Sequence, residues 1–427
     1  MITGNKKIKV LVIGSGAREH ALCWKLKQSP LLAELYAAPG NPGMAAVARL
    51  VELKVDDISG LCRFARMEQI DLTVVGPEYP LSLGVVDAFE SEGLQIFGPS
   101  RAAARLESSK EFCKQILNAA GVVTAACRVF EDGARLREHI ESAVFPLVLK
   151  ADGLAAGKGV FVCMQREEAH AALASGLGQP PGSRVLVEEY LSGLEASFMV
   201  ATDGQRVATL ASSHDYKRAG EGDRGPNTGG MGSVSPTPRL KPEVEEKILS
   251  QVIEPVLAEM RRRATPFRGF LYAGLMLDKN GRISVLEFNA RLGDPETQSI
   301  LVRLESDLLP LLLELSCSGG LVAPLPELSW SRDRAVTVVM AASGYPEKPR
   351  LGDSISGLDE AAQLPGVQIF HAGTKMQGAN RLVTAGGRVL SVTARAGSID
   401  EAARLAQQGC GLISFDGAQL RRDIGLA

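Results

Sequence analysis

A carboxylate and an amide stand two residues apart in the segment VLEFNARLGDPETQ, at Glu287 and Asn289. Residues two apart in a β-strand share one face, so their side-chain oxygens would point the same way. Such oxygens suit Mg²⁺, and Arg291 continues that face. A solvated strand edge often carries a pair of this kind. The apolar flank VLEF instead favours a metal site, because a carboxylate beside a buried segment needs a partner.

A glycine-rich turn, KADGLAAGKGV, carries two lysines, Lys150 and Lys158. Its spacing is one residue too short for a Walker loop, and Gly159 stands where that loop has Ser or Thr. The turn also lies between two expected strands rather than between a strand and a helix. We expect a hairpin whose backbone amides close over a polyphosphate, with the lysines as cations. A mobile surface hairpin without a ligand is the alternative.

The segment VLVIGSGAREHA places Gly14 and Gly16 between an expected strand and an expected helix. Helix N-terminal amides attract anions, so this is a candidate phosphate loop with Arg18 as its cation. A dinucleotide fingerprint would have a third glycine where Glu19 stands, and an acidic residue should end the second strand, which ends in AAPGNPG. These departures disfavour a nicotinamide or flavin dinucleotide. Either a smaller phosphorylated ligand or a turn with no ligand remains.

Residues 224–236, RGPNTGGMGSVSP, contain four glycines and two prolines and no apolar run that could bury a helix or strand. We therefore expect a loop. Glycine is costly to order, so a dense cluster indicates backbone close to a ligand, although a disordered linker has a similar composition. The preceding segment HDYKR at 214–218 contains both acidic and basic residues, which suits a zwitterionic ligand. The alternative is a solvent-exposed surface, which is where a run of charged residues more often lies.

Several domains must position these groups, since 427 residues are too many for one core. At the N-terminus short apolar strands alternate with helical stretches, which is the rhythm of a parallel α/β sheet. We expect its strands at 8–14, 34–40, 71–77 and 94–100.

The middle of the chain is predicted to be a compact α+β unit. A helix is expected over 101–120, followed by strands joined by glycine-rich turns. A long amphipathic helix at roughly 242–263 precedes a hairpin whose turn is Asn280 and Gly281. Beyond the Pro-rich stretch 321–330 the sequence becomes β-rich and carries few candidate catalytic groups.

The composition is that of an ordinary soluble globular protein, with 45% hydrophobic residues, 22% charged residues and a net charge of -2. No basic field argues for nucleic acid. The apolar run at 308–315 is too short to span a membrane, and no signal-peptide core precedes the first strand. The seven cysteines lack CxxC spacing and the five histidines lack metal-ligand spacing. We expect reduced thiols, no zinc site and a cytoplasmic protein.

The segments GSGAREHAL, KADGLAAGKGV, GPNTGGMG and EFNARLGDPETQ, in this order, closely resemble the phosphoribosylamine–glycine ligase family of ATP-grasp enzymes in purine biosynthesis. The segments GPE at 76–78, LYAGLMLD, FHAGTK and GGRVL match as well, so the resemblance covers essentially the whole chain. GPNTGGMG followed by EFNARLGDPETQ is far more specific than a glycine motif alone. Ser15 is a departure, since the family commonly has Asn there.

The resemblance implies a multidomain α/β and α+β fold. A parallel α/β domain over 1–105 would bind the phosphoribosylamine, an ATP-grasp core would span 106–325 with a lid at about 122–192, and a small β-rich domain would span 326–427. It further implies a monomer that uses ATP and Mg²⁺, or Mn²⁺. ATP would phosphorylate glycine to glycyl phosphate, which the amine of 5-phosphoribosylamine would attack to give glycinamide ribonucleotide.

The same resemblance implies the site residues. The catalytic groups would be Arg291, Asp215 and Lys217, and the metal ligands Glu287 and Asn289. The nucleotide would be contacted by Lys110, Lys150, Gly153, Gly157, Lys158, Gly159, Glu188, Glu189, Tyr190, Leu191 and Glu195. The other substrates would be contacted by Gly14, Gly16, Arg18, Glu78, Asp215, Gly229 and Gly230.

Met276 stands where ATP-grasp relatives often carry a further acidic metal ligand, so we expect a thin protein shell around the metal. Two rival interpretations remain. A formate-using transformylase or a carboxylase of purine metabolism would share the flap and the metal strand but should lack GPNTGGMG beside HDYKR. A non-catalytic nucleotide-binding protein is disfavoured because Lys110, Lys150 and Glu287 are all retained.

Overall fold

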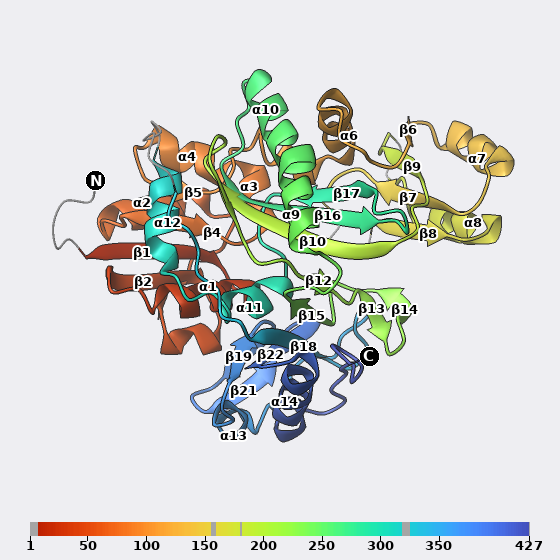
Figure 1. Cartoon of the computed structure of the whole chain (residues 1–427). Helices are drawn as coiled ribbons and strands as arrows, with labels where there is room; N and C mark the ends of the chain where they lie inside the picture. The colour runs from red at the N-terminus through yellow and green to blue at the C-terminus, as the bar shows by residue number, and fades with distance from the viewer. Residues whose placement is uncertain (1–6, 155–158, 180–181, 318–324, 427) are drawn as a thin grey trace.

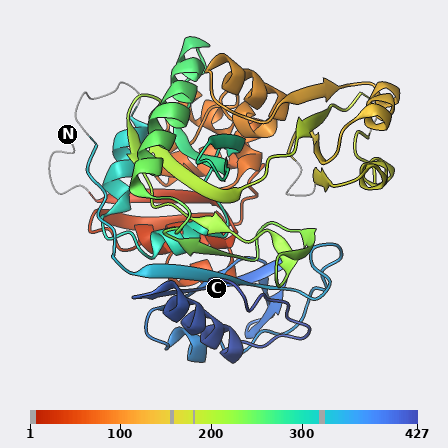
Figure 2. The same cartoon turned by 45° about the vertical axis from the view of Figure 1, so that its right-hand side comes forward.

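The computed structural model describes residues 7–154, 159–179, 182–317 and 325–426. Across these residues no helix is long and apolar enough to cross a membrane. Figure 1 and Figure 2 show an N-terminal part, a central part from which a lid projects, and a C-terminal part packed beneath them.

The N-terminal part is a parallel sheet, as the sequence predicts. It has five strands in the order β3-β2-β1-β4-β5, and the short β3 was not among the four strands expected. Leu11 and Ile13 of β1 belong to one hydrophobic core, and Val10 and Val12 belong to another. Both faces of the strand are therefore buried, which explains its continuous apolar sequence. The elements are β1 (Ile8–Gly14), β2 (Leu32–Pro39), β3 (Arg49–Leu50), β4 (Leu72–Val75), β5 (Ile96–Phe97), α1 (Ala17–Leu26), α2 (Ile58–Met67), α3 (Glu78–Leu83) and α4 (Val85–Ser91).

The lid is a four-stranded antiparallel sheet in the order β6-β9-β7-β8 with a core of its own, at the right of Figure 1. Lys150 of β7 pairs with Val160 of β8, so the glycine-rich turn joins two strands as predicted. Gly157 and Lys158 of this turn lie outside the described residues. The elements are β6 (Cys127–Phe130), α7 (Gly133–Ser142), β7 (Leu147–Ala151), β8 (Val160–Cys163), α8 (Arg166–Ala174) and β9 (Val185–Glu189).

The central part is an antiparallel sheet in the order β11-β10-β16-β17. The predicted hairpin is present, and Gly281 at its turn has a φ of 78°, which glycine adopts without strain. The elements are α5 (Arg105–Ser108), α6 (Lys110–Ala119), β10 (Leu194–Thr202), β11 (Val207–Thr209), β16 (Gly269–Leu277), β17 (Ile283–Asn289), α11 (Glu296–Leu301) and α12 (Leu308–Ser316).

The long helix predicted near 242–263 is present as α9 (Pro242–Ile248), a π-helical turn at Leu249–Ile253 and α10 (Glu254–Arg262). Pro255 stands in the first turn of α10. Because proline has no backbone N–H to donate, the regular hydrogen-bond ladder is interrupted before it, and the π turn accommodates the break.

The C-terminal part is a sheet in the order β12-β15-β18-β22-β19, covered by α14. Two of its strands, β12 and β15, come from the middle of the chain, next to the glycine-rich segment. The elements are β12 (His214–Asp215), β13 (Arg218–Gly220), β14 (Arg224–Asn227), β15 (Gly232–Ser235), β18 (Arg334–Ala341), α13 (Leu358–Ala362), β19 (Val367–His371), β20 (Thr374–Gln377), β21 (Arg381–Thr384), β22 (Arg388–Ala396) and α14 (Ile399–Leu412).

The prediction that residues 224–236 contain no strand was wrong, because β14 and the fully buried β15 lie within them. Burial of β15 does not need apolar side chains. Ser233 donates to Pro295 O at 2.9 Å and Ser235 donates to Ser212 O at 2.9 Å, so both hydroxyls are satisfied. Small residues allow a close approach to β18, which an apolar pattern does not reveal.

Candidate active site

A cavity of about 770 Å³ opens where the N-terminal part, the lid, the central sheet and the C-terminal part meet. Gly14, Gly16 and Gly230 do not line it, whereas all the other predicted site residues that the structure describes do. Those are Arg18, Glu78, Lys110, Lys150, Gly153, Gly159, Glu188, Glu189, Tyr190, Leu191, Glu195, Asp215, Lys217, Gly229, Glu287, Asn289 and Arg291.

Two lysines are fixed at the lid side of the cavity by one buried carboxylate. Lys150 of β7 lies 2.8 Å from Glu188 and donates to Leu286 O at 3.2 Å. Lys114 of α6 lies 3.3 Å from the other oxygen of Glu188. Sequence reasoning missed Lys114, although it follows Lys110 by four residues and so shares its helix face.

Lys110 begins α6, where Ser109 caps the helix. The backbone N–H of Lys110 donates to Asp152 of the lid at 2.6 Å, and its ammonium donates to Gly153 O at 2.8 Å. Burial lowers the pKa of Lys110, although Glu287 opposes this shift. The start of the glycine-rich turn is thus attached to α6, with a lysine at the junction.

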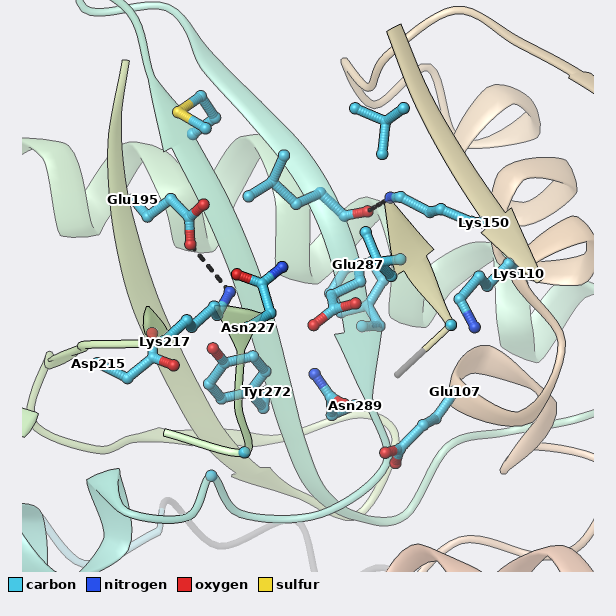
Figure 3. A pocket seen from close by; sticks show the side chains of 18 of the residues that line it. Glu107, Lys110, Lys150, Glu195, Asp215, Lys217, Asn227, Tyr272, Glu287 and Asn289 are labelled. Carbon is cyan, nitrogen blue, oxygen red and sulfur yellow. Dashed lines mark hydrogen bonds and ion pairs between the residues drawn. The ribbon is translucent and has the colours of Figure 1, made fainter. Parts of the chain in front are cut away.

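Glu287 lies between Lys110 and Lys150 on one side and Lys217 on the other (Figure 3). Burial would raise the pKa of its carboxyl group, but the three lysines outweigh burial and hold the pKa below its usual value. Within the described parts of the chain no group donates a hydrogen bond to this carboxylate. Its oxygens are therefore available to a hard cation.

Asn289 ends β17 beside Glu287, and its side-chain oxygen accepts from Arg291 at 3.1 Å. That oxygen keeps a second lone pair for a metal ion. Met276 of β16 lines the cavity, and no group of three His, Cys, Asp or Glu suited to a metal occurs among the described residues. Among the described residues, Glu287 and Asn289 are thus neighbouring side chains whose oxygens could hold a metal ion.

Arg291 joins the central part to the N-terminal part through ion pairs. It lies 3.2 Å from Glu78 of α3 and 3.1 Å from Glu107 of α5. Burial opposes the charge of Arg291, but Glu107 and Glu78 raise its pKa above the usual value. Burial also raises the pKa of Glu107 to about 7. Sequence reasoning missed Glu107, whose carboxylate also accepts from Ala290 N–H at 2.7 Å.

A second charged group lies across β16, where Lys217 is 2.9 Å from Glu195 and close to Asp215 (Figure 3). Burial raises the pKa of Asp215 to about 7, although Lys217 opposes this shift. Burial would lower the pKa of Lys217, but Asp215 and Glu195 raise it well above its usual value. Tyr272 and Glu296 complete this wall and were not predicted, although Glu296 belongs to the quoted GDPETQ segment.

The glycine loop of the N-terminal part is filled by its own side chain. Glu19 accepts from Gly16 N–H at 2.6 Å and from Arg18 Nε at 2.5 Å. A Cβ on Gly14 would lie 2.3 Å from the Glu19 side chain, so glycine makes room for this carboxylate. The residue that replaces the third glycine thus occupies the helix N-terminus, and Arg18 reaches the cavity instead.

The glycines of GPNTGG have different surroundings. Gly230 has a φ of +110°, and a Cβ there would lie 2.5 Å from Pro295, so packing inside the protein accounts for it. Gly229 lines the cavity, and its carbonyl accepts from Arg388 at 2.5 Å. Arg388 also lies 3.2 Å from Asp294, which brings the C-terminal part into the site. Arg388 lies in the segment GGRVL, which carries part of the family resemblance, but the sequence did not predict it as a site residue.

Apolar residues also line the cavity, among them Val148, Val160 and Phe288, and Val148 pairs with Glu188 at the start of the connector 188–191. Apolar side chains near backbone polar groups suit a nucleotide base. Lysines around a metal-competent carboxylate suit its phosphates, and the Asp215 and Arg291 groups suit the two ends of an amino acid. Such an arrangement can stabilise phosphoryl transfer by positioning and charge neutralisation.

Family models for phosphoribosylglycinamide synthetase match the chain in three consecutive segments. The N domain matches residues 8–107, the ATP-grasp (A) domain matches 108–297, and the C domain matches 335–427. The phosphoribosylamine–glycine ligase of Ralstonia nicotianae is 47% identical over 422 residues, which cover 98% of this chain and 99% of the relative.

The crystal structure of phosphoribosylamine–glycine ligase from Thermotoga maritima is similar with a TM-score of 0.81 and 34% identity, covering 97% of this chain and 100% of that chain. N5-carboxyaminoimidazole ribonucleotide synthetase from Thermotoga maritima has a TM-score of 0.64 and 17% identity over 96% of this chain and 99% of its own, which shows a shared fold. Since three family models and a nearly full-length relative match it, the chain belongs to the phosphoribosylglycinamide synthetase family of ATP-grasp enzymes.

Proposed function

We propose that this protein ligates glycine to 5-phosphoribosylamine, with cleavage of ATP to ADP and phosphate, in purine biosynthesis. The observation that carries the proposal is Glu287 surrounded by Lys110, Lys150 and Lys217 in one cavity. The names of the relatives at 47% identity support the same reaction. The family uses ATP and a divalent metal.

A carboxylate is a poor electrophile, so the first step gives glycine a leaving group. A glycine carboxylate oxygen attacks the terminal phosphorus of ATP, the bond to ADP breaks, and glycyl phosphate forms. Lys110 and Lys150 offset the phosphate charge, which is the main demand of phosphoryl transfer. Glu287 and Asn289 would hold Mg²⁺ or Mn²⁺, whose charge would neutralise phosphate oxygens.

In the second step the amine nitrogen of phosphoribosylamine attacks the acyl carbon of glycyl phosphate. The bond to phosphate breaks, and the nitrogen loses a proton as the amide forms. We assign the glycine ammonium to Asp215, with Lys217 beside it, and the carboxylate or acyl phosphate to Arg291. Arg18 and Glu78, which line the cavity in the N-terminal part, would bind the phosphoribosylamine. Gly14 and Gly16 would not contact it, because Gly16 N–H donates to Glu19 and Gly14 makes room for the Glu19 side chain.

The nucleotide would lie between the lid and the central sheet, with adenine at the backbone of 188–191 and the turn containing Gly153 and Gly159 over its phosphates. Glu195 would accept from the ribose hydroxyls. Lys217 pairs with Glu195 at 2.9 Å, so ribose binding would share or displace this contact.

We further propose that the enzyme acts as a monomer in the cytoplasm. Residues from the N-terminal part, the lid, the central part and the C-terminal part of one chain line the cavity, which supports a monomer. The seven cysteines are thiols, and Cys23, Cys62, Cys113, Cys163 and Cys410 are buried, which suits a reducing compartment.

Phosphate release from purified protein, ATP and Mg²⁺ tests the function. Release should require both glycine and phosphoribosylamine, and the product should have the mass of glycinamide ribonucleotide. Equal turnover with formate or bicarbonate in place of glycine would show that the protein is instead a transformylase or a carboxylase.

A further inference from the structure

The last residues of the chain lie against the hairpin β13–β14, and both chain segments meet near the C label in Figure 1. We propose that Arg421 is a positioning residue that fixes this hairpin and thereby the cavity residues at its base, Lys217 and Asn227. The inference rests on the proposed function for its kinetic consequence, but its structural consequence can be measured separately.

The hairpin has few means of holding its own shape. Strand β13 has three residues, β14 has four, and their register shifts between Arg218 and Gly220. Gly222, Asp223 and Gly225 have positive φ angles, so the turn is sharply bent. The β14 residues are exposed or only partly buried. An isolated two-stranded hairpin is marginally stable in water, so this one needs support from elsewhere.

Arg421 supplies that support from a buried position, with a relative exposure of 1%. Its guanidinium donates to the two oxygens of Asp423 at 2.9 and 2.7 Å. Another nitrogen reaches the hairpin, donating to Arg218 O at 3.1 Å and to Asp223 at 2.7 Å. The guanidinium also lies 5.1 Å from the centre of the Tyr216 ring. A buried guanidinium is tolerated only with such partners, so these bonds define one geometry.

The segment that carries Arg421 is itself anchored to the core. Ile424 is fully buried among the C-terminal core residues, and Gly425 N–H donates to the Tyr216 hydroxyl at 3.2 Å. Asp423 accepts from Gly222 N–H at 2.9 Å at the tip of the hairpin. The hairpin is therefore attached at its base and at its tip to a segment that is itself anchored in the C-terminal core.

The base of the hairpin transmits this support to the cavity. The backbone N–H and the hydroxyl of Thr228 donate to Lys217 O at 2.7 and 2.8 Å. Lys217 contacts Glu195, and Asn227 lines the same cavity. A displacement of about 1 Å at such groups can reduce an enzymatic rate about 10²-fold.

Arg421→Met tests the proposal, with Arg422→Met, the exposed neighbour, as the matched control. We expect amide hydrogen exchange over 216–228 to become about tenfold faster or more in Arg421→Met, while the core of β18 and β22 keeps its protection. The KM for glycine should rise about tenfold or more with a smaller change in kcat. Arg421→Lys should restore part of both effects, and Arg422→Met should match the wild type.

Unchanged exchange over 216–228 in a folded Arg421→Met protein would overturn the proposal. Equal acceleration across the whole C-terminal sheet would also overturn it, because Arg421 would then act on the domain and not on the hairpin. Should Arg421→Met fail to fold, Asp423→Asn, which weakens the same contacts, is judged by the same criteria. If the wild type shows no ligase activity, the proposed function fails while the exchange comparison still decides the role of Arg421.

Discussion

At the scale of single residues, the site is defined by carboxylates whose charge depends on their neighbours. Glu287 has a lowered pKa although it is partly buried, because Lys217, Lys150 and Lys110 surround it. Asp215 and Glu107 have less compensation, and burial raises the pKa of each to about 7. A carboxyl group is thus a candidate metal ligand at Glu287, whereas at Asp215 and Glu107 it can be neutral or ionised near pH 7.

Glu287→Gln should reduce turnover about 10²- to 10³-fold, because the amide is a weaker ligand and removes the charge that the lysines compensate. Phosphate release at increasing Mg²⁺ concentration measures this effect, and the variant should need more metal for half-maximal activity. Glu243→Gln, which alters an exposed carboxylate on α9, is the control. If Glu287→Gln needed the same Mg²⁺ concentration as the wild type, Glu287 would not be a metal ligand.

The pKa of Asp215, about 7, predicts a pH dependence for glycine use. The ionised carboxylate is the form that binds an ammonium group, and its fraction falls as the pH falls below 7. We therefore expect kcat/KM for glycine to be level above pH 7 and to fall about tenfold per unit well below it.

Variants assign this titration to its residue. Asp215→Asn should lose the titration near pH 7 and lower kcat/KM for glycine about 10- to 100-fold, the effect of one charged hydrogen bond. Glu107→Gln should keep the titration, although the pKa of Glu107 is also about 7. A titration that survives in Asp215→Asn would exclude Asp215 as its source.

At the scale of elements, β15 shows how a glycine-rich segment becomes a central strand. It pairs with both β12 and β18, and all four of its residues are buried. A Cβ on Gly232 would lie 2.5 Å from Thr337 O and 2.7 Å from Ile424. The missing side chain therefore permits the strand pairing and the seating of the C-terminal segment.

Gly232→Ala should lower the free energy of unfolding by about 1–3 kcal/mol, because the added methyl group overpacks a site with backbone on one side. Urea unfolding followed by circular dichroism measures this change. Gly133→Ala is the matched control, since a Cβ on that residue of α7 meets nothing within 4 Å. Equal stability of the two variants would mean that β15 and β18 separate at little cost.

At the scale of the whole molecule, two histidines, the buried His20 and the partly buried His371, join the N-terminal and C-terminal parts. The backbone N–H of His371 in β19 donates to Nδ1 of His20 in α1 at 2.9 Å. The side-chain amide of Asn41 donates to the backbone oxygen of His371 at 2.8 Å. Burial lowers the pKa of His20 to about 3 and that of His371 to about 4. Both rings are therefore neutral at pH 7. His20 Nδ1 can accept the hydrogen bond from His371 only while it carries no proton.

These histidines predict acid sensitivity of the folded protein. The unfolded chain takes up protons below a pKa of about 6.5 while the folded chain does not, so stability is lost as the pH falls from about 6.5 towards 4. For His20 the loss is about 2 kcal/mol at pH 5. The midpoint temperature of thermal unfolding should fall less between pH 7 and pH 5 in His20→Asn than in the wild type. His170→Asn, which alters an exposed histidine, should follow the wild type.

Much of this architecture is local in origin, and for that reason the sequence predicts it. The parallel sheet follows from short apolar strands, and the β16–β17 hairpin follows from Asn280 and Gly281. Lys150, Glu287 and Asn289, which line the cavity, could be predicted because they stand in short segments whose spacing has a chemical meaning. Lys114, Glu107 and Arg388 were missed because each enters the site through contacts with distant segments.

The amino-acid sequence was enough to predict the family, the alternation of helices and strands, and 17 of the residues that line the cavity. The three-dimensional packing was needed to show that Glu19 occupies the N-terminal glycine loop, that β15 is a buried strand, and that Arg421 contacts a hairpin residue 198 positions away. The physical reason is that periodicity and turn chemistry act between neighbours in the chain, whereas burial, ion pairing and close packing depend on which distant segments meet.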